Sequence, residues 1–194
     1  YVALKGENAD GNDFIPMAKK AGAARIIGGP NALAELHDLA RAYRLSLKDT
    51  VVVGLTGSAG KTTTKELMAT VLSTQYNIHY TQGNLNNQIG VPLTLLQITR
   101  AHEMAIVEMG ASHPGDIKEL VDIAEPNYGL ITNVGRAHLQ GFGSFEGVQQ
   151  TKRELYDYLV AHNGIEEGEG RGVVLLNLAR EAVVEGALCL VVES

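Results

Sequence analysis

The sequence predicts an α/β protein: a P-loop-type parallel sheet flanked by helices, with part of a smaller amino-terminal α/β domain. Strand-like and helix-like segments alternate from Thr50 onward, as in parallel sheets with helical crossovers. Residues 51–55 (VVVGL) form a continuous apolar run, which is typical of a strand buried on both faces. A glycine-rich loop that contains a lysine follows this run and leads into a helix, as phosphate-binding loops do.

The front of the chain, residues 1–48, has a different sequence pattern. We expect a strand at residues 1–4, a glycine-rich turn at 5–12, then a helix, a brief strand at 24–27 and a second helix at 31–43. One strand pair with two helices is too little for an independent core. This segment is therefore interpreted as the remnant of a larger amino-terminal domain.

Residues 49–194 are interpreted as a central domain that is incomplete after about residue 163. The expected strands are residues 51–55, 104–109 and 128–134, and the expected helices are 61–72, 114–125 and 145–159. Later in the chain, residues 166–172 (EEGEGRG) suit a solvated loop, and residues 173–176 and 188–192 are possible strands. A phosphate-binding role for that later loop is disfavoured because its glycines do not open a helix.

The composition limits the class of protein. A net charge of −6 argues against a general nucleic-acid or anionic-membrane binder, since such proteins need surplus Lys and Arg. No apolar stretch approaches the ~20 residues that cross a bilayer. Cys189 is the single cysteine, so an intrachain disulfide is impossible and a reducing compartment is the simplest setting. We expect a cytoplasmic monomer.

The strongest signal is TGSAGKTTT at residues 56–64. A glycine loop between strand and helix lets backbone N–H groups surround phosphate oxygens, helped by the positive end of the helix. Lys61 can reach terminal phosphates, and the Thr62 hydroxyl suits Mg²⁺. The spacing departs from the general P-loop, because Leu55 stands where a glycine is usual. The predicted nucleotide contacts are Thr56, Gly57, Ser58, Ala59, Gly60, Lys61, Thr62 and Thr63.

Polar residues that follow other strands are candidates for the same site. Glu108 ends a strand at its carboxyl edge, where open α/β sheets place ligands, although a surface cap is the alternative. His138 follows the next strand, and by itself it suits a structural role equally well. Asn84, Asn86 and Asn87 suit contacts to phosphate or acyl oxygens, or serve as turn residues.

From these motifs the sequence resembles the Mur ligases. TGSAGKTTT is similar to the shortened TGxxGKT loop of that family and of its folylpolyglutamate synthetase relatives. Further segments that resemble Mur ligase motifs are residues 81–92 (TQGNLNNQIGVP), 106–110 (IVEMG), 131–139 (ITNVGRAHL) and 151–154 (TKRE). Residues 3–14 resemble the loop that receives the UDP end of the precursor, and the similarity extends to about residue 163.

The resemblance implies a metal site. Thr62 and Glu108 would hold one Mg²⁺ ion, and His138 and Lys152 a second. Residue type alone makes Lys152 a solvated charge on a helix surface. The family implies instead that CO₂ carbamylates this lysine, which turns the cation into an anion. Lys61, His138 and Lys152 are the expected catalytic residues.

The resemblance also implies a reaction. The asparagine-rich segment is similar to that of the family branch that joins D-alanyl-D-alanine to the UDP-N-acetylmuramoyl tripeptide, with ATP and Mg²⁺, in peptidoglycan precursor synthesis. Another Mur-type or folylpolyglutamate-type amide ligase is the alternative, and a kinase or nucleotide switch is disfavoured by the loop spacing. The family's carboxy-terminal domain has no counterpart in these residues. We therefore expect the 194-residue chain alone to be inactive.

Overall fold

The computed structural model describes residues 1–136 and 139–162. Its centre is a parallel sheet in the order β2-β3-β1-β4, formed by β1 (Val51–Thr56), β2 (Ile78–Tyr80), β3 (Met104–Glu108) and β4 (Tyr128–Ile131). Leu55 pairs with Glu108 on one side and with Leu130 on the other, so the carboxyl ends of three strands meet at one edge. The predicted α/β fold with a parallel sheet is confirmed.

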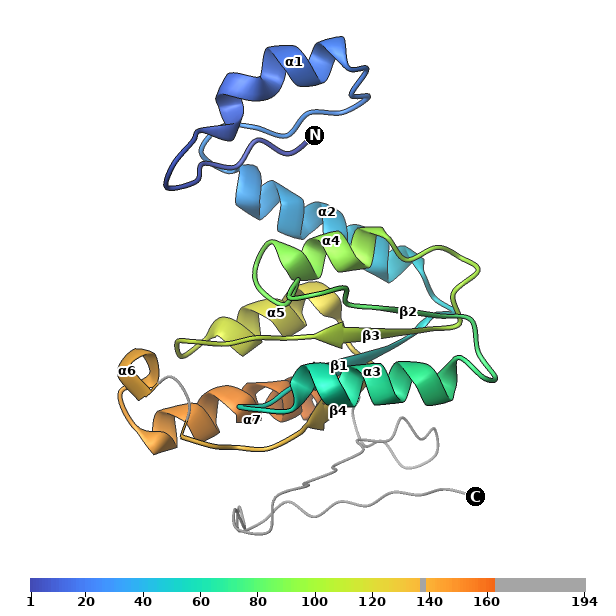
Figure 1. The fold of residues 1–194 in the computed structure, drawn as a ribbon, viewed down its shortest axis with the longest axis vertical. Helices are drawn as coiled ribbons and strands as arrows, with labels where there is room; N and C mark the ends of the chain where they lie inside the picture. The colour runs from blue at the N-terminus through green and yellow to red at the C-terminus, as the bar shows by residue number, and fades with distance from the viewer. Residues whose placement is uncertain (137–138, 163–194) are drawn as a thin grey trace.

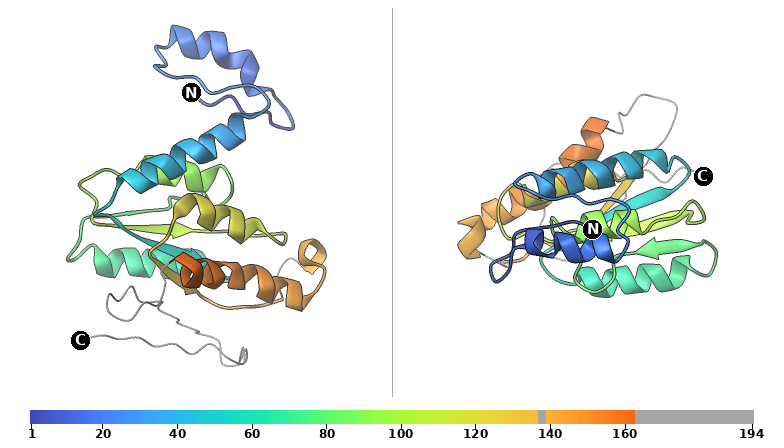
Figure 2. Two further views of the ribbon diagram at one scale, coloured as in Figure 1. Left: turned by 180° about the vertical axis from the view of Figure 1, so that it is seen from behind. Right: turned by 90° about the horizontal axis from the view of Figure 1, so that it is seen from above.

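Helices cover both faces of this sheet (Figures 1 and 2). On one face lie α2 (Ala32–Ser46), α4 (Gly90–Leu96), α5 (Asp116–Ala124) and α7 (Phe145–His162). The opposite face is covered by α3 (Lys61–Leu72). A short helix, α6 (Leu139–Phe142), precedes α7.

Successive side chains of each strand point to opposite faces of the sheet, so the apolar core is divided between the two helical layers. Val52, Ala105 and Val107 pack with α4, α5 and α7, whereas Leu55 and Ile106 pack with α3. Close contact between sheet and α7 depends on small residues in the strands. A Cβ at Gly129 would lie 2.5 Å from Leu159 Cδ1, and one at Gly54 would lie 3.2 Å from Leu155 Cδ1. These glycines let α7 lie directly against β1 and β4.

The front of the chain stands apart from the sheet, beyond α2 (Figure 1). It contains a 3₁₀ turn, η1 (Gly11–Phe14), followed by α1 (Ile15–Lys20). The two strands expected here are reduced to one parallel bridge between Val2 and Ile27. Helix α2 packs on α4 and α5, and its Ala40 belongs to the core beneath them. The proposed boundary near residue 48 therefore follows a helix that contacts the central layer.

Most expected elements are present, with shifted ends. The helix over Lys61–Leu72 is confirmed, while the strand expected over residues 128–134 ends at Ile131. Neither β2 nor α6 was expected from the sequence. The strands expected at 173–176 and 188–192 lie outside the described residues, as does Cys189. In the described part of the chain, no helix is long and apolar enough to cross a membrane.

Candidate active site

The loop between β1 and α3 needs glycine at both of its ends. Gly57 has φ 147° and Gly60 has φ 79°, which are values that L side chains rarely adopt. A Cβ at Gly57 would lie 2.0 Å from the Thr132 hydroxyl oxygen, so the loop presses directly on the segment that follows β4. Gly60 then caps α3, whose first turn presents its N–H groups at this edge of the sheet.

The segment after β4 holds this loop through several hydrogen bonds. Asn133 Oδ1 accepts the backbone N–H of Ala59 at 2.9 Å and that of Ser58 at 3.1 Å. The Ser58 hydroxyl accepts the Gly135 N–H at 2.9 Å, and the Thr132 hydroxyl donates to Ala59 O at 2.6 Å. From the sequence, these residues were identified only as part of the segment 131–139, which resembles a Mur ligase motif. Their role in supporting the loop comes from the fold.

Lys61 begins α3, and its side chain folds back over the loop. Its Nζ donates to Gly57 O at 2.8 Å, so the ammonium lies where a phosphate on the loop would meet it. Burial lowers the pKa of Lys61, and the nearby Glu108 carboxylate acts in the opposite direction. The lysine that was predicted to bind phosphate therefore lies against the backbone of the glycine-rich loop.

Three oxygen-bearing side chains converge beside this lysine. Glu108 ends β3 with 1% of its surface exposed, and its Oε1 accepts from Asn86 Nδ2 at 2.9 Å. The Thr62 hydroxyl lies 3.4 Å from Oε1 and 3.3 Å from Oε2 of the same carboxylate. Carboxylate and hydroxyl oxygens are ligands that Mg²⁺ prefers, so Glu108 and Thr62 fit the expected ion, whereas Asn86 turns its amide nitrogen toward Glu108.

A second lysine of α3, Lys65, is completely buried in the same cluster. Its Nζ lies 3.7 Å from Glu108 Oε2 and 3.3 Å from Glu66 Oε1. Lys65 was not among the site residues predicted from the sequence. The available signal was its position one helical turn after Lys61, on the same face of the helix.

Lys152 is also buried, with 2% of its surface exposed, so its interpretation as a surface charge is wrong. Its Nζ lies 3.4 Å from the Thr56 hydroxyl, at the end of β1. Burial, followed by the positive charge of Lys61, lowers the pKa of Lys152 to about 8. The side chain therefore reaches from α7 to the strand that carries the phosphate loop.

The remaining predicted site residues are Thr63, Asn84, Asn87 and His138. Asn87 Oδ1 accepts the N–H groups of Ile89 and Gly90, so this side chain caps the start of α4. Asn84 and Thr63 are exposed. His138 lies outside the described residues. Asn86 is thus the asparagine of the three whose side chain contacts Glu108.

This arrangement defines a class of protein: an α/β protein with a P-loop-type glycine–lysine loop beside the buried Glu108 carboxylate. The chain belongs to the Mur ligase family, since the family described as "Mur ligase middle domain" matches residues 55–180, more than half of the chain.

Characterised relatives are consistent with this assignment. The chain is 40% identical over 202 residues to "UDP-N-acetylmuramoyl-tripeptide--D-alanyl-D-alanine ligase" of Bacillus subtilis, covering 96% of the chain and 42% of the relative. It is 42% identical over 176 residues to the Escherichia coli ligase of the same name, covering 85% of the chain and 39% of the relative. The chain thus spans about two fifths of the length of these relatives.

Solved structures show the same fold. MurF from Acinetobacter baumannii matches with a TM-score of 0.77 at 34% identity, over 82% of this chain and 38% of that one. The MurF ligase from Thermotoga maritima in complex with ADP matches with a TM-score of 0.73 at 38% identity, over 81% and 40% respectively.

Proposed function

We propose that this chain forms the nucleotide-binding part of an ATP-dependent ligase that joins D-alanyl-D-alanine to the UDP-N-acetylmuramoyl tripeptide. One observation carries the proposal. The phosphate loop, the Thr62–Glu108 cluster and the buried Lys152 meet at one edge of the sheet, in a chain 40% identical to ligases of that name. This combination suits an enzyme that must bring a triphosphate close to a carboxylate.

In the proposed reaction, the terminal carboxylate of the tripeptide attacks the γ-phosphorus of ATP, and ADP leaves as an acyl phosphate forms. The amine of D-alanyl-D-alanine then attacks the acyl carbon, loses a proton and expels inorganic phosphate. Both first reactants are anions, so their approach requires compensating positive charge. Lys61 and the N–H groups at the start of α3 supply this charge from the chain itself. Bound Mg²⁺, held by Thr62 and Glu108, would neutralise phosphate oxygens further.

We propose in addition that Lys152 is carbamylated in the working enzyme and helps to hold a second Mg²⁺ ion, with His138 as the other expected ligand. Carbamylation needs a neutral amine, and a pKa of about 8 leaves a usable neutral fraction near neutral pH. The product would be a buried anion beside the phosphate loop. This chemistry fits the position of Lys152 better than an ammonium among metal ions does.

The test is the substrate requirement of a full-length ligase that contains this chain. Sustained ADP formation should need the UDP-tripeptide and D-alanyl-D-alanine together, and the 194-residue chain alone should not turn over. Omission of either substrate should reduce ADP release to background. If the enzyme instead extends a folate with glutamate, or adds one amino acid to a shorter muramoyl peptide, the proposed substrates are wrong.

A further inference from the structure

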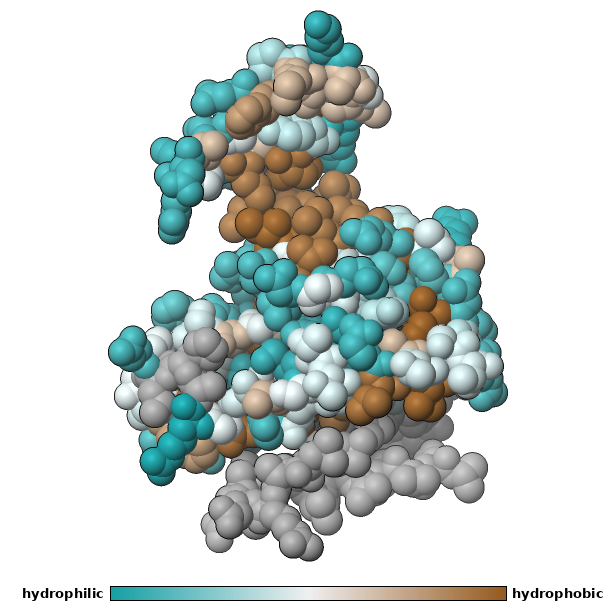
Figure 3. Space-filling view, viewed as in Figure 1, coloured by the Kyte–Doolittle hydropathy of each residue, from teal (hydrophilic) through white to brown (hydrophobic). Residues whose placement is uncertain are grey.

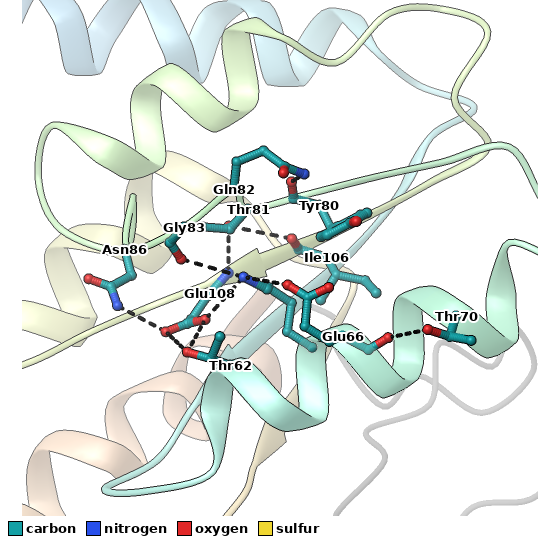
Figure 4. Close-up of polar contacts among 11 residues, drawn as sticks. Thr62, Glu66, Thr70, Tyr80, Thr81, Gln82, Gly83, Asn86, Ile106 and Glu108 are labelled. Atoms are coloured by element: carbon teal, nitrogen blue, oxygen red, sulfur yellow. Dashed lines mark hydrogen bonds and ion pairs between the residues drawn. The ribbon is translucent and has the colours of Figure 1, made fainter.

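The buried lysine of α3 links three elements at the candidate site. Lys65 Nζ approaches Glu108 at the end of β3, Glu66 on its own helix and, at 3.5 Å, the carbonyl oxygen of Gly83 after β2. It also lies 5.9 Å from the centre of the Tyr80 ring. Figure 4 shows Glu66, Tyr80, Gly83 and Glu108 in this cluster, with Thr62 and Asn86 beside the Glu108 carboxylate.

The buried carboxylate of Glu108 needs a positively charged partner. A carboxylate at 1% exposure has lost its water, and a buried charge is tolerated only when it is paired and hydrogen-bonded. Asn86 and Thr62 donate to it, but both are neutral. Among the described residues, Lys65 provides the ammonium within 4 Å of this carboxylate.

Lys61 is the competing cation. Lys61 and Lys65 are four residues apart and lie on one face of α3, with Glu108 beside both. Lys61 Nζ is bonded to Gly57 O rather than to the carboxylate, although its pKa responds to the charge of Glu108. Within the described residues, the ion pair of Glu108 is therefore made with Lys65 and not with Lys61.

We propose that Lys65 is a positioning residue that holds the Glu108 carboxylate in place for a divalent cation. Oε2 faces Lys65 and Oε1 accepts from Asn86, while the Thr62 hydroxyl lies within 3.4 Å of both oxygens. This inference rests on the proposed function, because it assigns Lys65 to the cation that accompanies the nucleotide.

The experiment measures ADP binding by a full-length ligase that contains this chain, in excess EDTA and across a Mg²⁺ titration. Lys65→Met keeps the length of the side chain and removes its charge. The Mg²⁺ concentration that gives half of the Mg²⁺-dependent gain in affinity should rise about tenfold or more, the usual effect of losing a group that orients a metal ligand. The ADP affinity in EDTA should stay within about threefold, since Lys61 and the loop remain.

The matched control is Glu66→Gln, which removes a half-exposed partner of Lys65 that does not touch Glu108. Its Mg²⁺ requirement should equal that of the original protein. Lys65→Gln is measured beside Lys65→Met as a second uncharged variant. Thermal melting establishes that each variant is folded.

The outcomes separate the two proposals. An unchanged Mg²⁺ requirement in a folded Lys65 variant overturns the positioning role. So does the failure of both Lys65 variants to fold while Glu66→Gln folds, because Lys65 would then serve the fold alone. If the original protein binds no ADP, or binds it without regard to Mg²⁺, the proposed nucleotide site fails and this inference fails with it.

Discussion

Asn133 holds Ala59 from across the site: its Oδ1 accepts the Ala59 N–H at 2.9 Å, although 74 residues separate the two in the chain. The same oxygen accepts the Ser58 N–H. The phosphate loop is therefore shaped by the end of β4 before any phosphate arrives. A loop that is already held in one shape avoids part of the entropic cost of ordering on binding.

Removal of this support should weaken nucleotide binding. Asn133→Ala loses two hydrogen bonds, each with a net contribution of about 1 kcal/mol, so the Kd for ADP should rise by up to about thirtyfold. Titration calorimetry on the 194-residue chain measures it. Asn77→Ala is the control, since Asn77 precedes β2 at the opposite edge of the sheet. An unchanged or tighter Kd in Asn133→Ala would mean that the carboxamide competes with phosphate.

Lys61→Ala should abolish turnover and leave the fold intact. Its ammonium contacts a loop carbonyl rather than the core, so little packing is lost. Loss of a charged phosphate contact should lower kcat about a hundredfold or more, measured as phosphate release by the full-length ligase. Lys118→Ala, which removes an exposed lysine paired with Asp122, should have no effect. Activity within about tenfold of the original would rule out the role of Lys61.

Lys152→Ala should be nearly inactive, and a small carboxylate in the buffer should restore part of the rate. The added anion would occupy the space of the proposed carbamate beside Thr56. Lys152→Arg should not be rescued, because the guanidinium fills that space and remains cationic. Arg153→Ala, the exposed neighbour on α7, serves as the control in the same phosphate-release assay. Full activity of Lys152→Ala without an added carboxylate would end the carbamate proposal.

Carbamylation of Lys152 should increase as the pH rises from 7 to 8. With the pKa lowered to about 8, roughly one tenth of the amine is neutral at pH 7 and about half at pH 8. The ¹³C carbamate signal from labelled bicarbonate should therefore grow as the pH rises from 7 to 8, and Lys152→Ala should lack it. Stability should also rise with pH above 8, since the unfolded chain then binds more protons than the folded one. A carbamate signal that falls over this range would contradict the prediction.

Leu155 should matter for stability rather than for activity. It is fully buried where α7 crosses Gly54 and Gly129, so Leu155→Ala leaves a cavity and should lower the free energy of unfolding by about 2–5 kcal/mol. Val160→Ala, on the exposed side of the same helix, should change it by less than about 0.5 kcal/mol. Urea unfolding of the 194-residue chain measures both variants.

Exposed apolar side chains also occur away from the site. Figure 3 shows a brown patch where the front of the chain meets α2. On α3, the side chains of Leu67 and Val71 are exposed. Single exposed apolar residues are ordinary on protein surfaces.

The sequence alone determined the order of the elements and the nature of the loop. Apolar runs such as residues 51–55, and glycines on both sides of a strand–helix junction, act through near neighbours in the chain. For this reason the helix over Lys61–Leu72 could be predicted to the residue. The ends of β4 and the missed β2 depend instead on pairing with strands far away in the chain.

Only the tertiary structure decided which charged side chains are buried. Lys152 and Lys65 lie on amphipathic helices, where a lysine alone is most often solvated. Their burial follows from the packing of α7 and α3 against strand ends that lie 96 and 43 residues away in the chain, at Thr56 and Glu108. Asn133 likewise gains its role because β4 pairs beside β1 and brings its end to the loop. Local sequence encodes the elements, whereas desolvation and charge pairing arise only when those elements pack together.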